Sequence, residues 1–411
     1  MKLKIVLYLR NLIFVSCFLI ASNLFTQSGW EQQTSGTNQT LLGVVMTDVN
    51  TAYVCGVSGI ILRSTNGGSN WQMLTTGTAR FLRSITYDNS NAVYAAGELG
   101  FIIKSTNSGA NWMTLNSGSN NTFVNISFYD ALFGTAVGLN GTIQRTTDGG
   151  NNWQTQISGV NVELTGVHFL NSATGYISGF GGLILKSTNT GANWNTLTSG
   201  VTNELRAVYF TDANTGIVCG ISGKILRTTN SGINWNSISS GTGNGLYSVY
   251  FTNSSTGYIS GTGVILKTTN GGVNWQNQVI NITSDLYSIH FSNNENGLSV
   301  GQNGIILKTS SGGIGINQIS TEVPEKFTLY QNYPNPFNPS TVITFDLLKL
   351  SHVKLSIFDI SGKIVEKIVD EKLSAGKYNV EWANSNLPSG IYFCRLEAEK
   401  YNSAIKMLLV K

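Results

Sequence analysis

Seven of the eight tryptophans recur at a nearly constant spacing, and this spacing limits the possible folds more than any other feature of the chain. Neighbouring members are 41 residues apart, except for a last step of 40: Trp30, Trp71, Trp112, Trp153, Trp194, Trp235 and Trp275. A fixed period of this length indicates one supersecondary unit repeated along the chain. We therefore expect a repeat array in which most recurring positions serve the fold.

Each repeat contains four short stretches that are typical of β-strands. In the fifth repeat these are 205–210, 217–219, 224–227 and the segment at Trp235, with turns at 212–216 and 220–223. The 46 glycines and the low charged fraction of 11% fit many tight turns between short strands. Four-stranded repeats of this length predict an all-β fold, the β-propeller.

The first end of the array has a tryptophan segment outside a complete repeat, and the last repeat lacks one. Trp30 precedes the first complete repeat, whereas the last repeat reads 310–317 without a tryptophan at the expected place. We expect the segment around Trp30 to supply the outer strand of the last blade, because this pairing would remove an open sheet edge. The sequence thus predicts a seven-bladed β-propeller over residues 29–316.

The third strand of every repeat ends in a basic residue. This basic strand-end set consists of Arg63, Lys104, Arg145, Lys186, Arg227, Lys267 and Lys308. One interpretation is a basic rim that holds an acidic ligand. The other is a side chain that was copied with the repeat and lies along apolar surface beside a turn. We favour the second, structural interpretation.

A turn of fixed pattern precedes six of the tryptophans, at 64–71, 105–112, 146–153, 187–194, 228–235 and 268–275. This turn resembles the Asp-box hairpin, although asparagine replaces the acid everywhere except at Asp148. Asparagine can form the same side-chain-to-backbone turn without charge. The whole unit is similar to the propellers of the photosystem II stability/assembly factor family over residues 29–313. The resemblance implies the propeller fold.

The N-terminal segment has the pattern of an export signal. Three basic residues precede an apolar run over 12–20, and small and polar residues follow it. The run is too short for a stable span, so we expect a signal peptide over 1–26, cleaved between residues 22 and 27. A lipoprotein site at Cys17 is the alternative, but the apolar run continues past this cysteine. The mature protein should have no membrane span.

The propeller segment offers few groups for chemistry. Its eleven basic and eleven acidic residues balance, which argues against nucleic acid or an anionic membrane as a partner. Glu98, Glu163 and Glu204 are the only candidates for a glycan hydrolase, and they form no recognisable catalytic pair. His168 and His290 share one repeat position, three blades apart, and predict no metal site. We expect no catalytic residue, no metal and no cofactor.

One face of the predicted propeller combines apolar, aromatic and basic side chains on its turns. The Gly-x-x-Gly turns and the loops between blades place there Val57, Phe81, Arg83, Leu139, Phe180, Arg206, Ile221, Tyr247 and Tyr287. Exposed apolar and aromatic side chains are typical of binding surfaces. The alternative is that these side chains fold back over the loops beside them. A binding surface here would receive an unknown polypeptide or glycan.

Residues 327–411 differ from the repeats in composition. All five prolines follow residue 323, and 317–326 has the character of a linker. The segments with alternating apolar residues are 353–358, 363–368, 376–382, 390–396 and 404–411. They predict a small antiparallel, immunoglobulin-like (Ig-like) β-sandwich.

Three blocks of this segment resemble the C-terminal sorting domain of the type IX secretion system. They are Tyr333, Pro334, Asn335, Pro336 and Phe337; then 357–363; then Gly390, Ile391 and Tyr392 with a closing stretch from Lys406 to Lys411. The resemblance implies passage through the periplasm and across the outer membrane by the type IX machinery. It also implies removal of the domain by a sortase-like protease, with the cargo released or fixed to surface lipopolysaccharide. A generic adhesion sandwich is the alternative.

These patterns predict a secreted or cell-surface protein that binds its partner without enzymatic activity. One alternative is a glycan-directed, sialidase-like hydrolase on the same scaffold. Another, implied by the family resemblance, is an assembly factor for a membrane complex. The sorting domain argues against this last role, because it would carry the propeller to the cell exterior.

Overall fold

The computed structural model describes residues 26–338, 340–383 and 387–411. Strands form almost all of the regular structure, and no helix in these ranges is long and apolar enough to cross a membrane. The predicted signal peptide, 1–26, lies outside the described residues except for Thr26. This residue begins the first strand, β1 (Thr26–Gln33).

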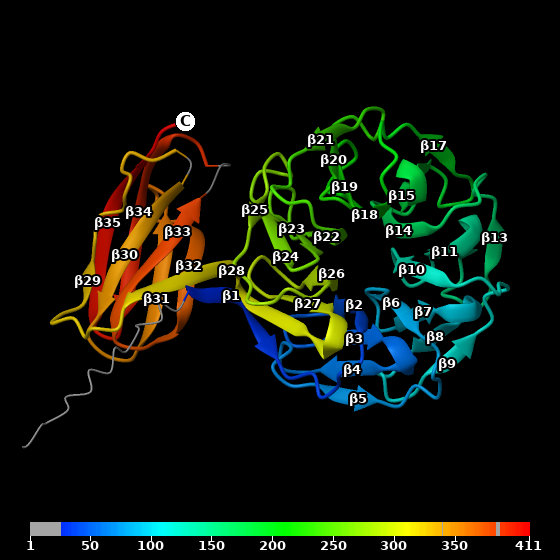
Figure 1. Ribbon diagram of the computed structural model, residues 1–411, viewed down its shortest axis with the longest axis horizontal. Helices are drawn as coiled ribbons and strands as arrows, with labels where there is room; N and C mark the ends of the chain where they lie inside the picture. The colour runs from blue at the N-terminus through cyan, green and yellow to red at the C-terminus, as the bar shows by residue number, and fades with distance from the viewer. Residues whose placement is uncertain (1–25, 339, 384–386) are drawn as a thin grey trace, which may run out of the picture.

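Six antiparallel sheets of four strands each follow one another along the chain, and we number them sheets 1 to 6. Their strands run in chain order from a central axis to the rim (Figure 1). The innermost strands of these sheets and of sheet 7 are β2 (Leu41–Met46), β6 (Leu82–Tyr87), β10 (Phe123–Phe128), β14 (Leu164–Phe169), β18 (Leu205–Phe210), β22 (Leu246–Phe251) and β26 (Leu286–Phe291).

The remaining propeller strands occupy equivalent places in each sheet. The second strands are β3 (Ala52–Gly56), β7 (Val93–Gly97), β11 (Gly134–Gly138), β15 (Gly175–Gly179), β19 (Gly216–Gly220), β23 (Gly257–Gly261) and β27 (Gly297–Gly301). The third strands are β4 (Ile61–Ser64), β8 (Ile102–Ser105), β12 (Ile143–Thr146), β16 (Ile184–Ser187), β20 (Ile225–Thr228), β24 (Val264–Thr268) and β28 (Ile306–Ser320). The rim strands are β5 (Gln72–Leu74), β9 (Met113–Leu115), β13 (Gln154–Gln156), β17 (Asn195–Leu197), β21 (Asn236–Ile238) and β25 (Gln276–Asn277).

Sheet 7 combines the two ends of the propeller segment. Its strands β26, β27 and β28 are joined by β1, with Glu31 opposite Lys308 and Gln33 opposite Ile306. The inner strands of successive sheets contact one another, and β26 also contacts β2, so the sheets surround the axis (Figure 1). The chain is therefore an all-β propeller whose N-terminal strand pairs with the sheet that lacks its own rim strand.

The cores lie between neighbouring sheets. Between sheets 4 and 5, Tyr176 stacks on Phe210 with 3.5 Å between ring centroids, and Trp235 meets Phe210 edge-on. Gly216 lies against the same phenylalanine, and a Cβ atom there would approach Phe210 Cζ to 2.5 Å. A glycine is required at this position because the aromatic ring occupies the space of a side chain.

The Asp-box turn before six of the tryptophans closes through side-chain-to-backbone hydrogen bonds. In sheet 5 the backbone N–H of Gly232 donates to Thr228 Oγ1 (3.0 Å), and the N–H of Asn234 donates to Asn230 Oδ1 (2.9 Å). Asp148 accepts the equivalent bond from the N–H of Asn152, also at 2.9 Å. The Asx side chain accepts this bond through one oxygen, which asparagine and aspartate both have, so asparagine can replace aspartate in the turn.

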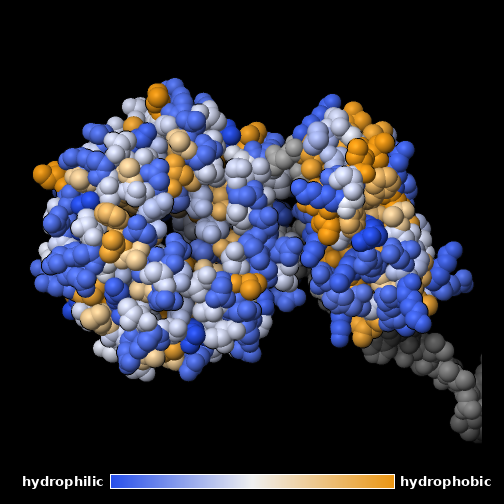
Figure 2. Space-filling view, turned by 180° about the vertical axis from the view of Figure 1, so that it is seen from behind, coloured by the Kyte–Doolittle hydropathy of each residue, from blue (hydrophilic) through white to orange (hydrophobic). Residues whose placement is uncertain are grey.

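The C-terminal unit has two facing sheets around one core. One contains β29 (Thr328–Leu329), β30 (Ser340–Leu347) and β33 (Gly376–Ala383); the other contains β31 (Ser351–Phe358), β32 (Ile364–Leu373), β34 (Gly390–Ala398) and β35 (Tyr401–Leu409). Phe337, Phe345 and Trp382 are among the large side chains buried between them. Hydrophobic residues (orange) gather more densely on this unit than on the propeller in Figure 2.

Strand β28 connects the two parts without a break. Beyond its pairing with β1 it pairs with β33, with Gln318 opposite Tyr378 and Ser320 opposite Lys377. Ile316 is 3% exposed and packs in the C-terminal core. The linker expected over 317–326 is therefore confined to the residues after Ser320, because β33 offers a sheet edge on which β28 continues.

Candidate functional site

The propeller has two faces with different turns. The upper face, as we name it, carries the loops between sheets and the 3₁₀ turns η1 (Val57–Gly59), η2 (Glu98–Gly100), η3 (Leu139–Gly141), η4 (Phe180–Gly182) and η5 (Gln302–Gly304). The lower face carries the Asp-box turns. All nine residues of the predicted binding face are on the upper face, because inner strands begin there and second strands end there.

A β-bulge marks the upper end of every inner strand. In sheet 5, Leu205 pairs with Gly220 and Ala207 pairs with Cys219, so Arg206 lies outside the ladder. The same irregularity occurs in the other sheets and sets apart Leu42, Arg83, Val124, Thr165, Tyr247 and Tyr287. Bulges often re-aim a side chain at a functional site, and four of the nine predicted residues occupy this position.

Arg206 forms one cluster on the upper face. Its Nη2 lies 2.7 Å from Glu204 Oε2, and its guanidinium carbon lies 4.9 Å from the centroid of the Phe180 ring. The Arg206 and Glu204 side chains are 30% and 33% exposed. An aromatic ring and a paired guanidinium at this level of exposure offer stacking and hydrogen bonding to a partner.

Tyr247 and Tyr287 form a second cluster, between sheets 6 and 7. Their ring centroids are 5.4 Å apart, and both hydroxyls donate to Asp285. Burial raises the pKa of Tyr287, and Asp285 adds to this effect. Tyr287 is therefore a neutral hydrogen-bond donor at physiological pH. Asp285 could not be identified from the sequence, because a single acid in a loop belongs to no motif.

The other predicted face residues lie apart from these clusters. Phe81, which is 39% exposed, donates its backbone N–H to Glu98 Oε2 (3.0 Å), and Arg83 is exposed. Val57, Leu139 and Ile221 are half-buried in their turns. The Glu98 carboxylate thus holds the loop at Phe81, and the Glu204 carboxylate pairs with Arg206. The two carboxylates do not contact each other.

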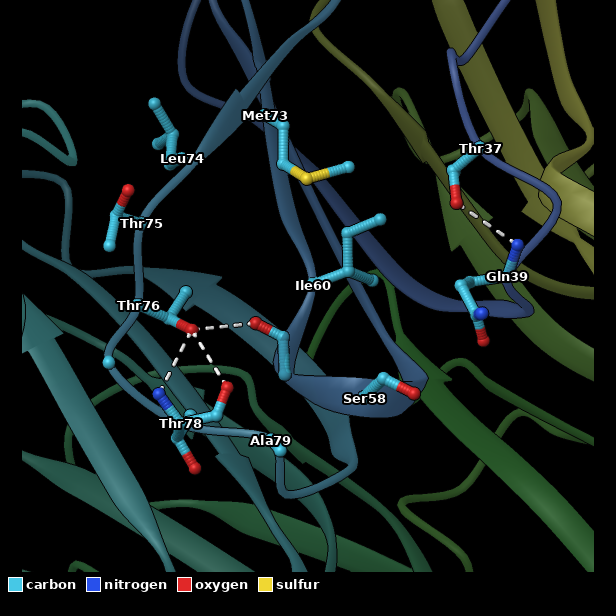
Figure 3. Close-up of a pocket in the computed structure, with 12 residues that line it drawn as sticks. Thr37, Gln39, Ser58, Ile60, Met73, Leu74, Thr75, Thr76, Thr78 and Ala79 are labelled. Atoms are coloured by element: carbon cyan, nitrogen blue, oxygen red, sulfur yellow. Dashed lines mark hydrogen bonds between the residues drawn. The ribbon is translucent and has the colours of Figure 1, made fainter.

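A cavity of about 510 Å³ opens on the upper face of sheet 1. Figure 3 shows Ile60 and Met73 at its centre, with Thr37 and Gln39 on one side and the loop after β5 on the other. Hydrogen bonds of Thr76 to the carbonyls of Gly59 and Thr78 hold this loop (Figure 3). In sheet 2, Arg80 and Phe101 replace Gln39 and Ile60, and the arginine lies over the ring.

The basic strand-end set reaches from one sheet to the next on the lower face. Lys104 Nζ donates to the carbonyl of Gly149 (2.9 Å), and Lys186 Nζ to that of Ser231 (3.1 Å). The Arg145 and Arg227 side chains donate to the carbonyls of Thr190 and Gly271, respectively. Lys308 Nζ donates to Ser69 Oγ (2.7 Å). Arg63 and Lys267 lie over the rings of Tyr53 and Tyr258. Five of the seven cations therefore hold the next Asp-box turn.

The two propeller histidines belong to a row of rings on the inner strands. His168 stacks on Tyr209, and Tyr209 meets Tyr250 edge-on. The ring centroids of Tyr250 and His290 are 4.3 Å apart. Burial lowers the pKa of each histidine to about 4, so both are neutral at pH 7. In the described ranges no group of three or more His, Cys, Asp or Glu side chains could hold a metal ion.

The sorting blocks come together in the C-terminal unit. Asn335 accepts the N–H of Leu408 (2.8 Å) and donates to the carbonyl of Lys406, and Phe337 is 2% exposed beside β35. The Tyr392 hydroxyl donates to the Pro388 carbonyl (2.8 Å). Tyr333 and Ile391 are exposed, at 81% and 38%. Gly390 pairs with Leu409, and the Lys411 N–H donates to Ser389 Oγ (3.0 Å). Pro334 and Pro336 each follow a cis peptide bond.

Two family profiles match the chain and together cover most of it. The profile described as photosynthesis system II assembly factor YCF48 matches residues 22–120, 112–243 and 228–329. The chain belongs to the YCF48 family. The profile described as secretion system C-terminal sorting domain matches 331–411. This YCF48-family protein therefore carries a type IX sorting domain, is handled by that machinery, and is exported to the cell surface or secreted.

Solved structures share the propeller fold. The structure "YCF48 bound to D1 peptide" is 21% identical, with a TM-score of 0.60 over 68% of this chain and 94% of that chain. YCF48 from Cyanidioschyzon merolae is 17% identical, with a TM-score of 0.59 over 68% and 98%. The WD40 β-propeller domain of Doa1 is 14% identical, with a TM-score of 0.59 over 69% and 97%. The comparison with curated proteins gave no match.

Proposed function

We propose that this YCF48-family protein is a seven-bladed propeller that binds a polypeptide on its upper face without catalysing a reaction. The observation that carries the proposal is the pair of aromatic clusters built on β-bulges, Phe180 with Arg206 and Tyr247 with Tyr287. Tyrosine and arginine are enriched among the residues that dominate binding energy at protein interfaces. We further propose that the C-terminal unit is an Ig-like sandwich which a sortase removes.

A polypeptide is favoured over a glycan by two observations. The related structure with a bound D1 peptide is a propeller–peptide complex. The cavity on sheet 1 has an apolar centre, Ile60 and Met73, surrounded by threonine hydroxyls, which suits an apolar side chain flanked by a polar backbone. The bound partner would then lie across loops of the upper face.

Binding is favoured over hydrolysis because two of the three candidate acids, Glu98 and Glu204, are already engaged. A glycosidase needs two carboxyl groups that flank one bond. Glu98 accepts a backbone N–H, and Glu204 forms an ion pair. Assembly of a photosystem does not fit a chain that the type IX machinery exports.

Capture from cell-surface extract by the immobilised full-length mature chain tests the proposal. We expect a captured polypeptide to be lost when Phe180 and Tyr247 are both replaced by alanine. The matched control is Tyr129→Ala, because Tyr129 is an exposed aromatic residue that follows β10 on the lower face. Equal capture by the double variant and the wild type would contradict the proposal. If the wild type binds a glycan array and the double variant does not, the ligand of the upper face would be a glycan and not a polypeptide.

A further inference from the structure

Asp285 has an unusual set of partners for a carboxylate. Thr262 Oγ1 and Gln302 Nε2 donate to it at 2.6 Å and 2.8 Å. The hydroxyls of Tyr287 and Tyr247 donate at 3.2 Å and 3.4 Å. All four donors are neutral, so they fix the position of the carboxylate without cancelling its charge.

No basic residue compensates this charge nearby. The described residues contain no Lys, Arg or His nitrogen within 4.0 Å of the Asp285 oxygens. The upper loops and turns of sheets 6, 7 and 1 cover 239–248, 261–264, 279–288, 301–306, 34–43 and 56–61, and Asp285 is the single formal charge in them. A fixed negative charge at a half-buried site attracts a mobile cation.

Two aromatic rings flank the carboxylate. Tyr247 and Tyr287 are half-buried, with ring planes tilted by 40° and centroids 5.4 Å apart. Their hydroxyls are held by Asp285, and Gln302 also bonds the Tyr287 hydroxyl at 3.0 Å. Ring faces carry the negative part of the aromatic quadrupole, so fixed rings beside a carboxylate favour an organic cation.

We propose that Asp285, Tyr247 and Tyr287 form a subsite for a lysine or arginine side chain of the polypeptide ligand. This inference rests on the proposed function and specifies its ligand. A hard metal ion fits less well, because calcium takes six to eight oxygen ligands whereas this site offers one carboxylate among donor groups. An ammonium or guanidinium group needs only the carboxylate and the ring faces.

The surroundings of the subsite favour a polypeptide over a free amine. Gln302 begins η5, and Gly304 at the end of this turn lies against the carbonyl of Thr37, which a Cβ atom would approach to 1.9 Å. Thr37 in turn lines the cavity on sheet 1. A chain with its basic side chain at Asp285 would therefore continue over η5 toward the cavity.

Titration of the mature full-length chain with benzamidinium chloride tests the subsite directly. Benzamide has the same shape without the charge and serves as the reference probe. We expect ligand-observed NMR to give benzamidinium binding that is at least about tenfold tighter than benzamide binding, and that is lost in Asp285→Asn. The matched control is Asp212→Asn, because other repeats carry asparagine at this lower-face position.

A second variant covers the case in which Asp285→Asn does not fold. Tyr287→Leu keeps the carboxylate and removes one ring face, and we expect it to weaken benzamidinium binding at least about threefold. Equal affinities for benzamidinium and benzamide, or unchanged benzamidinium binding in Asp285→Asn, would overturn the subsite. Failure of polypeptide capture with intact benzamidinium binding would instead count against the proposed function alone.

Discussion

The indole of Trp30 meets the ring of Phe291 edge to face, with 5.7 Å between ring centroids and 87° between planes. A residue of the first strand thus completes the core of the last sheet. Trp30 is 3% exposed and also contacts Tyr258. Closure of the ring therefore depends on side-chain burial as well as on the hydrogen bonds of β1 with β28.

Replacing Trp30 by alanine should destabilise the propeller by about 3–5 kcal/mol, because it empties a buried aromatic site. Urea denaturation measures this loss, and hydrogen exchange should increase in β28 over 306–313. Ile233→Ala is the control, since Ile233 is 71% exposed and should change stability by less than about 0.5 kcal/mol. If the free energy of unfolding falls but hydrogen exchange in β28 is unchanged, the result would argue against closure of the ring by β1.

The two half-buried histidines of the propeller should make it acid-sensitive. Their pKa values in the folded state are lowered to about 4, whereas an unfolded histidine titrates near 6.5. The unfolded state therefore takes up protons first, and folding stability falls as the pH drops from about 6.5 toward 4. Above pH 6.5 this contribution is fully present.

His168→Tyr tests this assignment, because sheets 5 and 6 carry Tyr209 and Tyr250 at the same position. We expect the variant to lose less stability between pH 7 and pH 4.5 than the wild type, by on the order of 2–3 kcal/mol. Urea denaturation at the two pH values measures the difference. An identical pH dependence in both proteins would show that the fold does not lower the pKa of His168.

The sequence alone could predict the features that repeat or that match a motif. Tryptophan spacing indicated four-stranded sheets and the pairing of the Trp30 segment with β28, and the proline and glycine blocks indicated the sorting domain. Features made by single residues from separate segments could not be predicted. Asp285 gains its partners from two neighbouring turns. The sheet 1 cavity is lined by Ile60 and Gln39, at positions where sheet 2 has Phe101 and Arg80.

The boundary between propeller and sorting domain was the least predictable part. The sequence after Ile316 has no proline until residue 324, and nothing in it signals that a strand passes from one core into another. Strand continuation depends on the free edge of β33, which only the folded unit provides. The same limit applies to the basic strand-end set, since its carbonyl partners lie in the next sheet.

A structural role of the basic strand-end set can be tested at Lys104. Lys104→Met keeps the alkyl chain and removes the hydrogen bond to Gly149. The Tyr94 hydroxyl also donates to this carbonyl (3.0 Å), so the carbonyl stays satisfied and the cost should be only about 1 kcal/mol. Lys326→Met, in an exposed segment, is the control for removal of a charge. Weakened polypeptide capture at unchanged stability would instead assign Lys104 to a binding rim.

Deleting 325–411 should abolish export and leave the propeller folded. The sorting domain is the part that the type IX machinery handles, so the truncated chain should remain in the cell. Ile316 would lose the core that covers it, and β28 would lose β33 as a partner. Adding Ile316→Ser should therefore improve the solubility of the truncated chain without changing its stability by more than about 1 kcal/mol. Immunoblots of cell and medium fractions measure export, with the full-length chain as reference. Truncated protein in the medium at the full-length level would contradict a sorting role for these residues.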